Sequence, residues 1–203
     1  MVLNDKKGRR YIRGEPSLGF AGSVLMDLFF LGKIVFTKST FEIINSRSTG
    51  SEILDQILEI LVTSKIKRDL RIWIANLSLR YKHYYHLYFE LMAQQGIIRK
   101  EFSRFLLFQL YYLQKPEIKS QLLEKIHSIV GNNKEPSINI ICLLTLLDVS
   151  GILLKYVSRG LRKKIRNRLK EILNSEQLDS SSREMILSIK EEIWSLAGPP
   201  NFF

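Results

Sequence analysis

The chain has little cysteine and no long apolar run. Cys142 is the only cysteine among 203 residues, so no disulfide can form within the chain. This usage is typical of a reducing compartment, and the apolar residues around Cys142 predict a buried structural thiol. No apolar stretch reaches the roughly 18 residues that a membrane-spanning helix needs, and the N-terminus lacks a signal-peptide core. The sequence therefore predicts a cytoplasmic protein.

Motifs of catalysis are also missing from the sequence. It contains no glycine-rich nucleotide loop, no serine nucleophile elbow and no pair of carboxylates in a setting that would shift their pKa values. His83, His86 and Glu90 are spaced to share one helix face, but they match no zinc motif and stand among aromatic residues typical of packing. We therefore expect no catalytic residue, no metal, no cofactor and no enzymatic activity.

Acidic residues are also fewer than basic residues. The chain has 31 basic and 20 acidic residues and a formal charge of +11, which indicates a polyanionic partner, either nucleic acid or anionic lipid. The segment from Lys155 to Glu171 holds eight basic residues and one acidic residue. A solvated helix face is the ordinary explanation of such a run, and the lack of compensating acid favours a binding surface about equally.

Length and composition predict three parts. Residues 1–16 are polar and basic, with two glycines and one proline, and are expected to form an N-terminal loop segment. Residues 17–198 are long enough to bury a core of their own and form one globular domain. Residues 199–203 follow Gly198 as a short tail.

Hydrophobic periodicity predicts a mainly α fold for that domain. Ser51 is expected to cap a helix whose apolar stripe includes Leu54 and Leu61. Helices are expected at 18–31, 51–61, 68–79, 84–94, 116–129, 138–147, 159–170 and 182–196, and hairpins at 34–37 with 41–44 and at 97–100 with 104–110. The prediction is a single compact helical domain with two or three short β-hairpins.

Five sequence segments carry a resemblance to a known family. They are Gly22–Leu28, Gly32–Ile34, Thr49–Leu58, Gly96–Glu101 followed by Phe105–Phe108, and Leu143–Leu147 running to Leu154. In this order and spacing the chain resembles the Golgi phosphoprotein 3 family over nearly its whole length. The resemblance implies that family's helical fold, no enzymatic activity, and binding to membranes that carry phosphoinositides.

The resemblance also points to positions for a lipid headgroup. The family uses a tryptophan and an arginine ahead of the first buried helix, and two arginines on the helix before the second hairpin. In this chain those positions fall beside Ile12, and at Ala21, Lys82 and Tyr85, and only Lys82 keeps a charge. The candidate headgroup residues are Lys82, Arg80, Arg13, Tyr85 and Tyr11.

The second predicted hairpin is a further candidate for membrane contact. Arg99, Lys100 and Arg104 flank Phe102, which we expect at the hairpin tip. The corresponding hairpin of the family is a proposed membrane-inserting element, and a basic rim around an apolar residue suits a membrane interface. For the following run, residues 105–108, a strand buried between helices is the stronger interpretation.

These observations favour a peripheral membrane protein that binds anionic phospholipid, similar to phosphatidylinositol 4-phosphate, through a basic face and a hairpin tip. The alternative is a winged-helix-like protein that binds nucleic acid through the basic segment 159–170. A third possibility is a scaffold for protein partners, including a homo-oligomer formed through an exposed strand edge.

Overall fold

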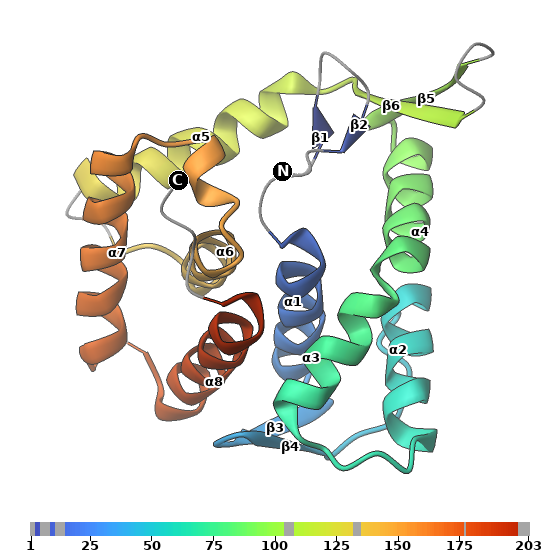
Figure 1. The fold of residues 1–203 in the computed structure, drawn as a ribbon, viewed down its shortest axis with the longest axis vertical. Coiled ribbons are helices and arrows are strands. Elements are labelled where there is room, and N and C mark those ends of the chain that lie inside the picture. Colours follow the sequence, from blue (N-terminus) through green and yellow to red (C-terminus); the bar gives the residue numbers. More distant parts are fainter. Residues whose placement is uncertain are drawn as a thin grey trace.

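The structure is a computed structural model that describes residues 3–4, 9–10, 15–103, 108–131, 135–176 and 178–198. These residues form eight α-helices and one 3₁₀ turn (Figure 1). The helices are α1 (Pro16–Phe30), α2 (Glu52–Thr63), α3 (Leu70–Leu79), α4 (Tyr81–Gln94), α5 (Pro116–Gly131), α6 (Ile138–Val149), α7 (Arg159–Asn174) and α8 (Ser180–Ala197), and the 3₁₀ turn is η1 (Leu153–Lys155). None of the helices in these ranges is both long and apolar enough to cross a bilayer.

Strands occur only as antiparallel pairs within the described ranges. The pairs are β1 (Leu3–Asn4) with β2 (Arg9–Arg10), β3 (Ile34–Thr37) with β4 (Thr40–Ile43), and β5 (Ile98–Ser103) with β6 (Phe108–Leu113). The mainly α prediction with two or three short hairpins is therefore confirmed. The β1–β2 pair falls within the segment predicted as a loop, and α1 begins at Pro16, in the first helical turn, where a missing N–H costs nothing.

Helix α1 lies in the middle of the fold because its sequence is apolar on most sides. Its side chains at Val24, Leu25 and Leu28 are fully buried, and α3, α6 and α8 pack around it. Gly22 permits this close packing, since a Cβ there would lie 2.7 Å from Leu146 Cδ2 and 2.8 Å from a methyl carbon on α8. The predicted Ser51 cap is confirmed at the start of α2.

A second, smaller cluster attaches the β5–β6 hairpin to α4. It consists of Tyr81, Tyr85, Phe89, Ile98 and Tyr111. The ring of Phe20 on α1 packs against both clusters and lies 5.5 Å from the Tyr81 ring, centroid to centroid. The hairpin is thus held by aromatic packing at its base, and Figure 1 shows it extending from the edge of the helical body.

The second hairpin is longer than predicted, and its turn lies elsewhere. Glu101 and Phe102, expected in the turn, lie within β5 opposite Leu110 and Gln109. The prediction that Phe102 occupies the tip is therefore wrong. The physical reason is that a strand with a solvated face accepts charged residues such as Glu101 as readily as a turn does, and both Glu101 and Phe102 are exposed.

Candidate functional site

The predicted headgroup residues occupy different environments. Arg80 joins α3 to α4, is exposed, and donates from Nε to Asn76 Oδ1 at 3.3 Å. Lys82 is exposed and has no hydrogen bond or ion pair to any described residue. Tyr85 is only 5% exposed, and its ring lies 4.1 Å from that of Phe89, centroid to centroid.

Tyr85 therefore contributes to the aromatic cluster beneath the hairpin. Ala21, at the family's first arginine position, is fully buried. Arg13 and Tyr11 lie outside the described residues and remain predictions. The exposed part of the predicted set thus consists of the two cations at the α3–α4 corner, Arg80 and Lys82.

The hairpin cations are largely neutralised. The Arg99 guanidinium lies 2.5 Å from Glu101 Oε1, and Lys100 forms an ion pair with Glu90 of α4. Arg99 also lies over the ring of Tyr112, 5.8 Å from its centroid. Phe102 is 62% exposed on β5 and remains available for contact. Arg104 lies outside the described residues, so its predicted contact remains untested.

The three residues considered for a metal have other neighbours. Glu90 pairs with Lys100. His86 Nδ1 lies 3.5 Å from the Tyr111 hydroxyl, and the His83 ring lies edge-on to Tyr84. No group of three potential ligands occurs among the residues that the structure describes.

Helix α7 holds the densest positive charge, with seven basic residues and one acidic residue. Its inner face is apolar, and the inner arginines bind Asp148 of α6 through short hydrogen bonds. Arg162 Nε lies 2.6 Å from Asp148 Oδ1, and Arg166 Nε lies 2.7 Å from Oδ2. The Arg162 and Asp148 side chains are only 9% and 12% exposed, so this ion-pair network helps to hold α7 against α6.

The outer cations of α7 form what we call the α7 stripe, which consists of Arg159, Lys163 and Lys170. Their spacing of four and seven residues places them along one side of the helix. Arg159, Lys163 and Lys170 are exposed and have no hydrogen bond or ion pair to any described residue. In Figure 1, α7 lies on the opposite side of the molecule from the β5–β6 hairpin.

A cleft of about 430 Å³ adjoins the α7 stripe, between α6, α7 and α8. Arg166 and Lys170 line it from α7, while Lys190 and Trp194 line it from α8. Sequence reasoning missed the two α8 residues, because they are separated by about twenty residues from the basic segment and stand in an ordinary amphipathic helix. Only the packing of α8 against the rest of the fold brings them beside α7.

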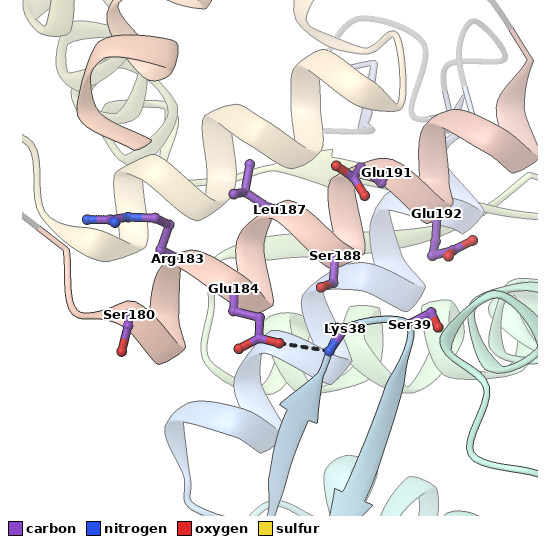
Figure 2. A pocket seen from close by; sticks show the side chains of 9 residues that line it. All are labelled: Lys38, Ser39, Ser180, Arg183, Glu184, Leu187, Ser188, Glu191 and Glu192. Carbon is purple, nitrogen blue, oxygen red and sulfur yellow. Dashed lines mark hydrogen bonds between the residues drawn. The ribbon is translucent and has the colours of Figure 1, made fainter. Parts of the chain in front are cut away.

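A cavity of about 490 Å³ lies between the β3–β4 turn and α8 (Figure 2). Three carboxylates line it, at Glu184, Glu191 and Glu192. The backbone N–H of Lys38 donates to Glu184 Oε1 at 2.8 Å, as the dashed line shows. Burial and the charge of nearby Asp69 raise the pKa of Glu192.

Arg183, at the far end of this cavity in Figure 2, donates to the backbone carbonyls of Ser175 and Leu178. Its charge is therefore engaged by the protein's own backbone. Carboxylates outnumber cations among the lining residues, and like charges repel, so this cavity is a poor site for a phosphate headgroup.

An aromatic groove of about 420 Å³ lies between α1, α4 and α6, next to the headgroup position carried over at Tyr85. Its lining is mostly apolar and includes one carboxylate, Asp27, whose pKa is raised by its apolar surroundings. Burial and the Asp27 charge also raise the pKa of Tyr88 to about 12. The described residues that line the groove offer an anion no cationic partner.

Comparison with known families identifies one match. The family model described as Golgi phosphoprotein 3 (GPP34) matches residues 1–189. A search of curated proteins found no match. The family match spans all the described helices, apart from the last residues of α8, and agrees with the helical architecture. The chain belongs to the Golgi phosphoprotein 3 family.

Proposed function

We propose that this protein is a non-enzymatic, cytoplasmic peripheral membrane protein that binds anionic phospholipid headgroups, similar to phosphatidylinositol 4-phosphate. Family membership supports this proposal. The observation that carries it is the α7 stripe, in which cations on one side of a single helix are exposed and lack acidic partners among the described residues.

The electrostatic attraction of the α7 stripe to an anionic membrane is large enough for reversible attachment. Each lysine or arginine near an anionic membrane contributes about 1 kcal/mol, so the three unpaired residues of the stripe, Arg159, Lys163 and Lys170, supply about 3 kcal/mol together. This attraction falls off within about 8 Å at physiological ionic strength. Attachment is therefore reversible and sensitive to salt.

Arg80, Lys82 and Phe102 supply secondary contacts in this proposal. Arg80 and Lys82 add two cations at a corner where the chain passes from α3 to α4. Phe102 adds apolar contact, but its neighbours Arg99 and Lys100 are already paired with carboxylates. We expect the hairpin to contribute less than the stripe.

Nucleic acid is the alternative partner for the α7 stripe. In a winged helix, the reading helix directly precedes a hairpin, whereas α7 is followed by α8, and β5–β6 follows α4. Helix α7 also contains no aromatic residue that could stack on a base. Both observations favour a lipid surface over a winged-helix mode of binding.

The test is vesicle flotation combined with nucleic-acid binding at the same salt concentration. The vesicles are phosphatidylcholine alone, or with 20% phosphatidylserine or 5% phosphatidylinositol 4-phosphate. We expect the double variant Arg159→Glu/Lys163→Glu to lose at least tenfold in partitioning. The matched control is Arg99→Glu/Lys100→Glu, which reverses two charges on the hairpin and is expected to lose less.

Two results would contradict the proposal. One is tight binding to duplex or single-stranded DNA without flotation on any anionic vesicle. The other is flotation that is equal on neutral and anionic vesicles, because the α7 stripe would then have no role in attachment.

A further inference from the structure

The cleft between α6, α7 and α8 contains an excess of positive charge. Arg166, Lys170 and Lys190 line it, and Asp148 is the one carboxylate among the described residues that line it. That carboxylate is already shared by Arg162 and Arg166. Lys170 and Lys190 have no hydrogen bond or ion pair to any residue that the structure describes. Like charges held together in this way are unfavourable unless an anion joins them.

Two buried polar atoms on the residues lining this cleft also lack a hydrogen-bond partner. They are the hydroxyl oxygen of Thr145 and Nη2 of Arg166. Thr145 is only 2% exposed, so water outside the protein does not satisfy its hydroxyl. Buried polar groups are nearly always paired in folded proteins, and an unpaired one often marks the place of a bound ion or water.

The remaining lining of the cleft is apolar and aromatic. Leu169, Leu173 and Leu187 form part of it, and Trp194 is 44% exposed there. The cleft thus offers charged donors beside an apolar and aromatic wall. This combination suits a small anion that is attached to a less polar body.

We propose that this cleft binds the phosphate of a phosphomonoester, with the attached group lying against Trp194 and Leu187. A phosphomonoester carries up to two negative charges on three free oxygens, which matches the two ammonium groups of Lys170 and Lys190 better than a singly charged phosphodiester does. The phosphate belongs either to a lipid headgroup or to a soluble metabolite. The inference does not rest on membrane attachment, because a soluble phosphomonoester would meet the same residues.

Trp194 supplies a direct test. The chain has two tryptophans, and the other, Trp73, is 1% exposed in the main core. We expect glycerol 3-phosphate to change the tryptophan fluorescence of the full chain with saturation, and glycerophosphocholine, a phosphodiester, to have no such effect. The variant Trp194→Phe should abolish the signal while folding normally.

Charge variants identify the site. Lys190→Ala and Lys170→Ala should each weaken the fluorescence titration by about tenfold, because each removes one charge-assisted hydrogen bond to the phosphate. The matched control is Lys164→Ala, an exposed lysine of α7 that does not line the cleft and is expected to leave the titration unchanged. An equal loss in all three variants would overturn the site, because it would indicate charge screening alone.

Vesicles distinguish the two sources of phosphate. Phosphatidic acid exposes a phosphomonoester, and phosphatidylserine does not, so the two are compared at equal surface charge. A preference for phosphatidic acid that Lys190→Ala removes supports a lipid headgroup, whereas a response to glycerol 3-phosphate without that preference supports a soluble ligand. The absence of both overturns the inference, even if Arg159→Glu/Lys163→Glu still abolishes flotation on phosphatidylserine.

Discussion

Helix α7 and the β5–β6 hairpin are both basic in sequence, but they differ in how much of that charge is free. On the hairpin, Glu101 pairs with Arg99 and Glu90 reaches Lys100 from the neighbouring helix. On α7, Asp148 pairs with Arg162 and Arg166 and Glu171 pairs with Arg168, while the α7 stripe has no acidic partner among the described residues. The comparison teaches that basic residues form a binding surface only where the fold leaves them without acidic partners.

The largest difference between α7 and the hairpin should appear in the free energy of unfolding that is lost when a carboxylate partner is removed. Asp148→Asn removes the carboxylate that compensates Arg162, a largely buried charge, and we expect a loss of about 3–5 kcal/mol in the free energy of unfolding. The matched change on the hairpin is Glu90→Gln, which breaks a more exposed pair and should cost less than about 1 kcal/mol. Urea denaturation of the two variants measures both values.

Equal losses in these two variants would contradict the comparison. If Asp148→Asn alone lowered the free energy of unfolding only slightly, the Arg162 guanidinium would be hydrated in the folded protein. The α7 network would then be as weakly coupled to the fold as the hairpin pairs.

Freeing the hairpin cations should narrow the difference in unpaired positive charge between the hairpin and α7. The double variant Glu90→Gln/Glu101→Gln releases Lys100 and Arg99 from their carboxylates. We expect its partitioning to anionic vesicles to rise, by up to about thirtyfold, because the two freed cations add as much as about 2 kcal/mol of attraction together. Flotation measures this, with Glu59→Gln on α2 as a control, since Glu59 is an exposed carboxylate that forms no ion pair with any described residue.

The N-cap at the start of α8 stabilises the helix that completes the cleft. Asp179 Oδ1 accepts hydrogen bonds from Ser181 Oγ at 2.6 Å and from the Ser182 backbone N–H at 2.8 Å. These bonds lower the pKa of Asp179 to about 2 from an ordinary 3.8. Removing such an N-cap with Asp179→Ala should cost about 1 kcal/mol near neutral pH.

The pH dependence of this loss has a definite sign. Because the pKa of Asp179 is lower in the folded state, its contribution to stability is present above pH 3.8 and disappears as the pH falls through about 2. The difference in unfolding free energy between the parent and Asp179→Ala should shrink over that interval. A difference that is constant with pH would show that the carboxylate charge has no part in the cap.

The smallest effect is expected at the exposed aromatic residue of the hairpin. Phe102→Ser should reduce vesicle partitioning by less than about threefold if the α7 stripe provides most of the attraction, and it should leave stability nearly unchanged because Phe102 is exposed. A loss of tenfold or more would make the hairpin the principal contact. Flotation and urea denaturation together decide between these outcomes.

Much of the fold could be predicted from local patterns in the sequence. The continuous apolar residues of α1 and α6 predicted central helices, and Ser51 marked the start of α2. The turn of the second hairpin was misplaced, because charged residues of β5 were taken for a turn. A strand with one solvated face accepts such residues as readily as a loop does.

The site was harder to predict, because it depends on contacts between distant segments. The pairing of Lys100 with Glu90, and of Asp148 with two arginines of α7, joins separate elements whose geometry the sequence does not display. Likewise, the burial of Tyr85 depends on rings contributed by the hairpin and by α4. Charge counting therefore located the α7 segment, but could not separate its structural arginines from its exposed ones.

The single thiol of the chain has a practical consequence. Cys142 is buried in α6, and burial together with the charge of Asp27 raises its pKa to about 12. In the native state it should resist alkylation at pH 8, since a thiol reacts as the thiolate and needs access to reagent. The rate at which a maleimide modifies Cys142 therefore reports how often the domain centre opens, with no engineered label.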